Sequence, residues 1–328
     1  MLKKFWAFAL AVGMLTLGGQ SVQAAATDFA VAPQLPANQI DHSVHYYSLL
    51  VQPGSQQDLT LLVQNGAATA ARFKVSPNRA TTGSDGDIDY TQHTPAKPEG
   101  LPLDIETLLP KPKVYTIPAR TTKTLHLPLK APKTAFEGIL LGAIRVEKLS
   151  NDPTKQTNIA YTIGVQLQSS QQLPASSPKL GFDGVKLTYT TTGAHVAATI
   201  DNPASMIQSG LTVQTHIYRR KTHHLIAHHQ QAGIRMAPNS QMFVTADNAK
   251  ALVPGDYQLV VNANNGATQW HFTRNFSIKS NLLKSTAAKD PATPNSQALP
   301  AWLTVMLLVI ALLLAAIVWS LVRKRHRQ

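Results

Sequence analysis

The residues best suited to chemistry gather in one short stretch of the second half of the chain. Three basic residues are followed closely by four histidines: Arg219, Arg220, Lys221, His223, His224, His228 and His229. If the stretch were one strand, its histidines would divide between the two faces, and a pair on one face could supply two zinc ligands. A zinc site also needs further ligands and hydrogen-bond partners that orient them. The run of cations instead favours a hairpin whose tip is basic and solvated.

These histidines also predict a response to pH, because an ordinary imidazole titrates near pH ~6.5. Residues 27–300 hold 11 of the 12 histidines, so full protonation would raise their net charge from +7 to +18. Residues 159–300 hold 11 cations and 5 acidic residues, for a net charge of +6, whereas residues 27–158 hold 13 and 12, for +1. We therefore predict tighter binding of anionic polymers near about pH 5 than at about pH 7.5, mainly through the second half.

Three aspartates alternate with other residues in Asp85-Gly86-Asp87-Ile88-Asp89, as they do at the start of a calcium-binding loop. An EF-hand loop needs Gly at its sixth position and Glu at its twelfth. Those positions hold Tyr90 and Ala96 in this sequence. The pattern therefore favours a glycine-containing turn that enters a strand over a calcium site.

Catalytic patterns are missing from the sequence. It contains no Gly-x-Ser-x-Gly, His-Glu-x-x-His or glycine-rich phosphate loop, and its lack of cysteine excludes a thiol nucleophile. A glycosidase needs two carboxylates at a set separation, and no glutamate of this sequence lies in a recognised catalytic string. Basic residues without interleaved aromatics argue against nucleic-acid binding. We predict no catalytic residue, cofactor or metal.

The elements that must position these residues are strands. Apolar residues alternate with polar ones, as in Leu59–Val63, Leu125–Leu129 and Val185–Tyr189, and this period of two buries one face of a strand. Frequent Pro, Gly and Asn turns separate the strands, so the fold class is all-β, with two tandem immunoglobulin-like β-sandwiches. Tyr257 follows Pro254-Gly255-Asp256 as a tyrosine corner would. We place the boundary near residue 155, because Ile159–Leu167 has the pattern of an opening strand.

The two ends of the chain predict its location. Lys3 and Lys4 precede a short apolar run and small residues, as in a secretory signal peptide. Residues 301–322 are apolar and uncharged, long enough for one transmembrane helix. Trp302 and Trp319 lie near the two ends of this helix, where indole rings prefer the membrane interface, and the cations Arg323, Lys324 and Arg325 follow it directly. The C-terminus is then cytoplasmic and the large central region extracellular.

The predicted organisation has six parts. They are a signal peptide (1–26), a first domain (27–155), a second domain (156–280), a stalk (281–300), a transmembrane helix (301–322) and a basic tail (323–328). Within the first domain, the proline-rich stretch His93–Lys113 cannot be a central strand and predicts a long surface loop. Sugar rings stack on exposed aromatic side chains, for which the first half offers Tyr46, Tyr47, Tyr90 and Tyr115.

Several strings in this chain resemble one family in order. In the first half these are Phe29–Pro33, Leu35–Asp41, Val51–Gly54, Asn78–Thr82, Gly86–Tyr90 and Phe136–Ile144. In the second half they are Tyr161–Val165, Asn202-Pro203, Met236–Ser240, Pro254–Tyr257 and Trp270–Phe276. Together they are similar to the WxL-interacting proteins of Gram-positive bacteria, from about residue 29 to about residue 280.

The resemblance implies a first domain that binds peptidoglycan and a second that binds host or extracellular-matrix components. It also implies partnership with WxL surface proteins. Two alternatives are a cell-wall-active hydrolase and a chaperone-like escort for surface proteins. Clearing of a suspension of purified walls would indicate the hydrolase, and complexes that persist on the mature surface would argue against the escort.

Overall fold

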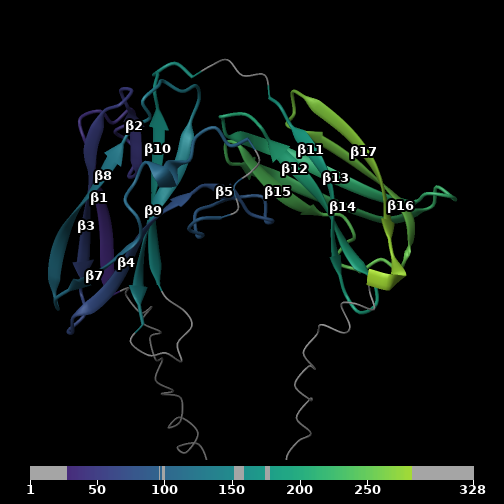
Figure 1. Ribbon diagram of the computed structural model, residues 1–328, viewed down its shortest axis with the longest axis horizontal. Helices are drawn as coiled ribbons and strands as arrows, with labels where there is room; N and C mark the ends of the chain where they lie inside the picture. Colours follow the sequence, from purple (N-terminus) through teal and green to yellow (C-terminus); the bar gives the residue numbers. More distant parts are fainter. Residues whose placement is uncertain (1–27, 96, 98–99, 151–158, 174–177, 283–328) are drawn as a thin grey trace, which may run out of the picture.

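The computed structural model describes residues 28–95, 97, 100–150, 159–173 and 178–282. The predicted signal peptide, transmembrane helix and basic tail, and nearly all of the predicted stalk, lie outside these residues. Among the described residues, no helix is long and apolar enough to cross a membrane. The described chain is almost entirely strands and turns, which confirms the all-β prediction. Figure 1 shows two β-sandwiches side by side.

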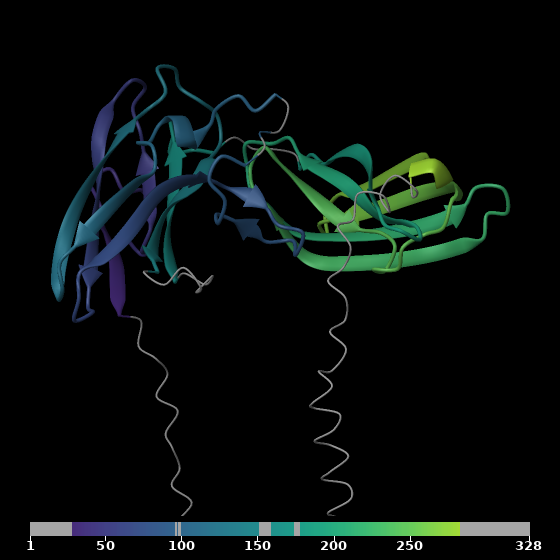
Figure 2. The same ribbon diagram turned by 60° about the horizontal axis from the view of Figure 1, so that its bottom comes forward.

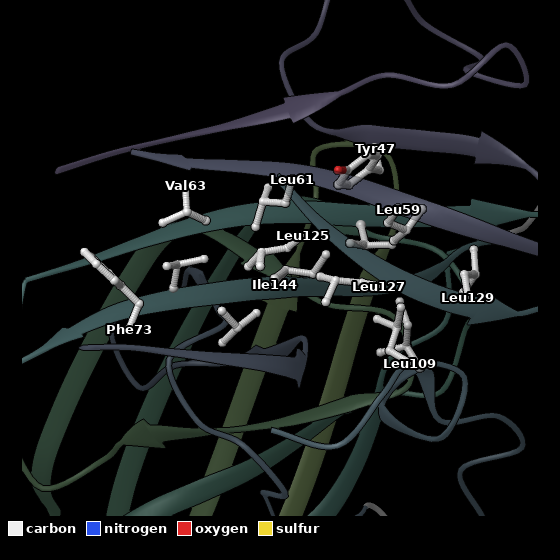
Figure 3. Close-up of a cluster of buried hydrophobic side chains, with 14 of the residues drawn as sticks. Tyr47, Leu59, Leu61, Val63, Phe73, Leu109, Leu125, Leu127, Leu129 and Ile144 are labelled. Carbon is white, nitrogen blue, oxygen red and sulfur yellow. The ribbon is translucent and has the colours of Figure 1, made fainter. Parts of the chain in front are cut away.

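The first sandwich packs a three-stranded sheet, in the order β1-β3-β8, against a five-stranded sheet, in the order β2-β10-β9-β4-β7. Its elements are β1 (Phe29–Gln34), β2 (Tyr47–Leu50), β3 (Gln56–Asn65), β4 (Ala71–Arg79), the 3-10 helix η1 (Ile105–Thr107), β7 (Lys113–Ile117), β8 (Thr121–Lys130), β9 (Leu140–Leu149) and β10 (Ala160–Gln168). Alternate residues such as Leu59, Leu61 and Val63 are fully buried, as their spacing predicts. Figure 3 shows these side chains between the sheets, with Phe73 and Ile144.

The strand β10 does not have the place that we expected for it. We expected Ile159–Leu167 to open the second sandwich, but β10 pairs with β9 and β2 in the first sandwich. Val165 and Leu167 are fully buried in the core of the first sandwich. The parallel pairing of β10 with β2 fills the edge of the five-stranded sheet, which a local pattern of alternation cannot reveal. The chain crosses between the sandwiches after Gln168.

The second sandwich packs the sheet β11-β12-β15 against the sheet β14-β13-β16-β17. Its strands are β11 (Gly181–Tyr189), β12 (Ala194–Asn202), β13 (Gln208–Arg219), β14 (Leu225–Met236), β15 (Ser240–Thr245), β16 (Gly255–Asn264) and β17 (Gln269–Ile278). At the start of β16, the hydroxyl of Tyr257 donates a hydrogen bond of 2.8 Å to the carbonyl of Val253. The predicted tyrosine corner is therefore confirmed.

A small hairpin of the first domain joins the two sandwiches. Its strands are β5 (Thr81–Thr82) and β6 (Ile88–Asp89), and Figures 1 and 2 show it reaching toward the second sandwich. The Thr82 hydroxyl lies 2.6 Å from the Ser240 hydroxyl and accepts a hydrogen bond from the backbone N–H of Ala237. A small apolar cluster surrounds this contact: Ala80, Ile88, Tyr90, Ile139, Leu141, Met206, Ile207 and Ala237.

The aspartates that resembled a calcium loop accept hydrogen bonds in and around this hairpin. Asp85 and Asp89 accept backbone N–H bonds from residues two positions later, which fixes the turns. Asp87 accepts two hydrogen bonds from the Arg235 guanidinium at 2.7 and 3.0 Å. The hydrogen bonds from Arg235 hold the pKa of Asp87 below its usual value. Within the described part of the chain, no three acidic or histidine side chains gather as a metal site would require.

Candidate binding surfaces

The predicted basic tip lies where strand β13 turns back into β14. The backbone N–H of Arg219 donates to the carbonyl of His224, and the N–H of His223 donates to the carbonyl of Arg219, which closes the loop. His223 has a positive φ of 53° in this turn. Residues 220–224 are all exposed. The hairpin with a basic, solvated tip is therefore confirmed for Arg220, Lys221, His223 and His224.

Arg219 does not belong to the exposed tip. Its guanidinium carbon lies 5.1 Å from the centre of the Tyr257 ring, and its Nη2 lies 3.4 Å from the Tyr257 hydroxyl. The side chain thus packs on the tyrosine corner and anchors the hairpin. Arg219 therefore contributes to stability through its packing as well as through its charge.

The four clustered histidines are spread over three environments. His223 and His224 lie in the turn, so they share no strand face with His228 and His229, as a continuous strand would have required. His228 points outward, and its ring stacks on that of His216 with centroids 6.4 Å apart. His229 is paired with the fully buried Thr215. Neighbouring strand residues point to opposite faces, so these imidazoles do not converge on a common point.

The four candidate tyrosines of the first half also differ in environment. Tyr47 is fully buried and donates a hydrogen bond of 2.6 Å to the carbonyl of Thr60, and this burial raises its pKa. Burial likewise raises the pKa of Tyr90 to about 12, because its ring packs in the cluster between the sandwiches. Tyr46 is 37% exposed, beside Gly164. Tyr115 alone among the four lies between lysines.

Two lysines flank the ring of Tyr115 on the edge strand β7. The Nζ atoms of Lys113 and Lys123 lie 5.3 and 5.7 Å from the ring centre. A cation at this distance is attracted by the electron-rich face of the ring. Lys111, two residues before Lys113, adds a third exposed cation. We call this set, Lys111, Lys113, Tyr115 and Lys123, the lysine–tyrosine surface.

A small cavity lies beside this surface. Its volume is about 40 Å³, and Lys111, Lys113 and Tyr115 belong to its lining. The remaining lining is apolar: Val75, Pro77, Leu109, Pro110, Leu127 and Ile144. This volume exceeds that needed for one water and suits a small apolar group such as a methyl. The arrangement can therefore receive a carboxylate and an adjacent methyl at once.

A buried ion pair positions the loop that lines this cavity. The Arg79 guanidinium donates two hydrogen bonds to Asp104, at 2.6 and 2.9 Å, and both side chains are less than 10% exposed. Glu106 accepts the backbone N–H groups of Arg79 and Thr94. Burial alone would raise the pKa of Asp104, but the hydrogen bonds and charge of Arg79 outweigh it and hold that pKa below its usual value.

The proline-rich stretch is therefore more than the surface loop we predicted. Ile105, in the 3-10 helix, is fully buried and Leu109 is 8% exposed, so the second half of the stretch packs into the first core. The backbone N–H of Lys130 donates to the carbonyl of Leu108, which ties the loop to β8. The lysine–tyrosine surface was missed by sequence reasoning, although Lys111-Pro112-Lys113-Val114-Tyr115 directly after the prolines marks it.

Comparison with known families matches both halves of the chain. Residues 29–148 match the peptidoglycan-binding domain of the WxL Interacting Protein family, and residues 154–288 match its host-binding domain. This chain belongs to the WxL-interacting protein family. Both matched domains are described as binding domains. The division between the two matches falls before β10, whereas β10 packs in the first sandwich.

Solved structures that match this WxL-interacting protein share little sequence with it. A complex of the CsuC chaperone with the CsuE tip subunit from Acinetobacter baumannii is 11% identical, covering 68% of this chain and 93% of that one, with a TM-score of 0.30. The CupB2 chaperone of Pseudomonas aeruginosa is 14% identical, with 69% and 95% covered and a TM-score of 0.27. The E. coli chaperone DraB is 15% identical, with 69% and 93% covered and a TM-score of 0.25. A comparison with curated proteins found no match.

Proposed function

We propose that this chain is a non-enzymatic, membrane-anchored surface protein whose first domain binds peptidoglycan through the lysine–tyrosine surface. That surface lies wholly within the residues that match the family's peptidoglycan-binding domain. Anchoring through residues 301–322, with the two sandwiches outside the cell, rests on the sequence pattern of the two chain ends. The observation that carries the proposal is the meeting of three lysines, one aromatic ring and a methyl-sized cavity.

The chemistry of peptidoglycan suits this arrangement. The terminal alanines of its stem peptides carry a carboxylate and a methyl group on the same carbon atom. The ammonium groups of Lys113 and Lys123 would bind the carboxylate through charge-assisted hydrogen bonds. The cavity beside Tyr115 would take the methyl group. Charge and shape together would then distinguish such a ligand from a simple anion.

A different role for these lysines must be separated from binding. β7 and β8 are the last strands of their sheets, and lysines on an edge strand also prevent pairing with a second chain. Replacement by glutamate keeps a charge on the edge but repels a carboxylate ligand. Charge reversal therefore tests the ligand role without removing the protection of the edge.

The experiment is a pulldown of the purified full-length protein on purified cell walls. Lys113→Glu with Lys123→Glu should weaken binding by about tenfold or more, because two favourable contacts become repulsive. Lys250→Glu, which reverses an equally exposed cation of the second domain, should leave binding within about twofold. Unchanged binding by the double variant, with an unchanged melting temperature, would refute this site.

For the second domain, we propose association with WxL surface proteins and with host components. The family's host-binding domain supports this role. The basic tip, with Arg220, Lys221, His223 and His224, would add binding of anionic polymers that strengthens on acidification. His223→Gln with His224→Gln should then reduce the ratio of binding at about pH 5 to binding at about pH 7.5. A wild-type protein that binds anionic walls equally at both pH values would contradict the proposal.

A further inference from the structure

The outer face of the four-stranded sheet in the second sandwich has an unusual composition. On its central strands β13 and β16, residues such as Val213, Ile217 and Leu259 are fully buried, so their neighbours point outward. The strand register places these outward side chains in rows across the sheet. The rows are Leu225, Tyr218, Gln258 and Asn275; His228, His216, Val260 and Thr273; Gln230, Gln214, Asn262 and His271; and Thr212, Asn264 and Gln269.

We call this set of side chains the amide face. None of its members is an aspartate, glutamate, lysine or arginine, and the amides of asparagine and glutamine are its commonest groups. Exposed protein surfaces commonly draw about a quarter or more of their residues from the four charged types. The nearest charged group along β16 is Asp256, one row beyond, where its carboxylate accepts the Ser277 hydroxyl. The absence of charge thus extends over four neighbouring rows of this sheet face.

Hydrogen bonds within the amide face arrange its polar groups in advance. The Gln214 amide donates to Gln230 at 2.9 Å, and the Gln258 amide donates to Asn275 at 3.4 Å. The ring Nδ1 of His271 lies 2.7 Å from the Asn262 carbonyl oxygen. Each side-chain amide offers two donors and two acceptor sites, so one lateral bond leaves most of them open. The face therefore presents fixed donors and acceptors side by side.

The rings on the face are also ordered. His216 stacks between His228 and Tyr218, with centroid distances of 6.4 and 6.3 Å and interplanar angles of 21° and 17°. This stack lies on the half of the face next to the basic tip. It supplies further hydrogen-bonding atoms at ring edges while the imidazoles are neutral.

We propose that the amide face binds an uncharged polysaccharide. Sugar hydroxyls are both donors and acceptors, as amides are, and a neutral chain needs no counter-charge on the protein. An anionic polymer would find its cations at the tip, outside this face. A protein partner would need buried aromatic or arginine anchors, and the face offers one tyrosine and no arginine. A neutral glycan is therefore the occupant that the charge and chemistry of the face favour.

This inference goes beyond the proposed binding of peptidoglycan, since it concerns the other domain and a ligand without charge. Either of these two proposals can be wrong while the other is right. Lysine variants of the first domain test wall binding, whereas changes on the amide face test glycan binding. A protein that loses one activity and keeps the other would separate the sites.

The test measures binding of the purified full-length protein to neutral probes by calorimetry or on a glycan surface. The probes are cellohexaose, chitohexaose, dextran and mannan, with heparin as an anionic comparison. We expect at least one neutral probe to bind. Gln214→Glu with Asn262→Asp should weaken that binding by about tenfold, because these isosteric changes remove donors at the centre of the face. Gln64→Glu, an exposed site of the same chemistry on β3, should not change it.

A second variant protects the test against misfolding. Gln230→Glu changes one exposed residue of the edge strand β14 and should still weaken binding by a few-fold. Three results would overturn the proposal. They are binding of none of the four neutral probes, equal binding by the variants, and salt-sensitive binding of heparin alone, which would assign ligand binding to the basic tip.

Discussion

The two sandwiches of this protein share an architecture but differ in how they use charge. The first fixes a proline-rich loop with the buried pair Arg79–Asp104 and places lysines around Tyr115 on an edge strand. The second leaves four neighbouring rows of one sheet face without charge and presents Arg220 and Lys221 at the hairpin tip. Nearly equal numbers of cations and anions in residues 27–158 therefore coexist with a concentrated cationic surface. Net charge per domain is a poor guide to which ligand each domain can hold.

The largest expected effect comes from breaking the buried pair. Asp104→Ala would leave the Arg79 guanidinium buried without its partner, which typically costs about 3–5 kcal/mol. We expect the first sandwich to unfold at lower denaturant concentration while the second keeps its own transition. Denaturation of the full-length protein followed by hydrogen exchange would resolve the two. A loss below about 1 kcal/mol would show that this pair does not anchor the loop.

Two matched tyrosine substitutions, one in each sandwich, compare how much a tyrosine hydroxyl contributes to stability; we expect an intermediate effect. Tyr47→Phe in the first domain and Tyr257→Phe in the second each remove a hydroxyl that donates to a backbone carbonyl. We expect each change to cost about 1–2 kcal/mol, because a partly buried carbonyl acceptor loses its donor. Differential scanning calorimetry would measure both. Similar losses would mean that both cores depend equally on such bonds, whereas a neutral change at Tyr257 would contradict the role of the tyrosine corner.

Much of this architecture could be predicted, because alternation of apolar residues is a local signal. It correctly indicated the buried face with Leu59, Leu61 and Val63 in the first sandwich. The turn Pro254-Gly255-Asp256, also a local signal, correctly indicated the tyrosine corner of the second sandwich. The strand β10 was assigned to the wrong sandwich, since its partners β2 and β9 are chosen by long-range pairing. The amide face was also invisible, because its rows join residues far apart in sequence.

In the basic tip, too, local sequence predicted the exposed hairpin but not the contacts between residues far apart in the chain. A run of cations before histidines predicted an exposed hairpin, and four of its side chains are indeed solvated. Arg219 was included in that tip by position, yet its partner Tyr257 lies on another strand and turns it inward. The lysine–tyrosine surface likewise depends on Lys123, which comes from β8 rather than from the stretch that contains Tyr115.

Acidification should change the contributions of two aspartates to folding stability in opposite directions, one aspartate in each sandwich. The pKa of Asp104 is lowered in the fold, so its contribution to stability is present above the unfolded pKa of about 3.9 and is lost as pH falls through the lowered value. Burial raises the pKa of Asp201, on β12, so its ionised form is disfavoured in the fold and its contribution is lost as pH rises. Asp201→Asn should therefore stabilise the second sandwich at neutral pH by about 1 kcal/mol.

Thermal unfolding of the wild type and Asp201→Asn at about pH 4 and about pH 7 would test whether the substitution stabilises the second sandwich as predicted. The benefit of the substitution should shrink at the lower pH, where the native carboxyl becomes protonated. A benefit that grows on acidification would mean that Asp201 is stabilised as a carboxylate. Asp104→Asn provides the opposite comparison in the first sandwich.

The smallest effect is expected at the contact between the sandwiches. Asp87 and Arg235 are both more than half exposed, so Asp87→Ala should cost less than about 1 kcal/mol of stability. Thr82→Val should cost more, because the buried Ser240 hydroxyl and Ala237 N–H lose a partner. Urea denaturation would rank the two changes. The reverse order would show that the exposed ion pair, rather than the buried hydroxyls, joins the sandwiches.

The most direct test of the account compares both surfaces on the same purified walls. Lys113→Glu with Lys123→Glu should reduce binding by about tenfold, whereas Gln214→Glu with Asn262→Asp should leave it within about twofold. Added salt should weaken the wild type, since its contacts are ionic. If the amide-face variant lost wall binding and the lysine variant kept it, the assignment of peptidoglycan to the first sandwich would be contradicted.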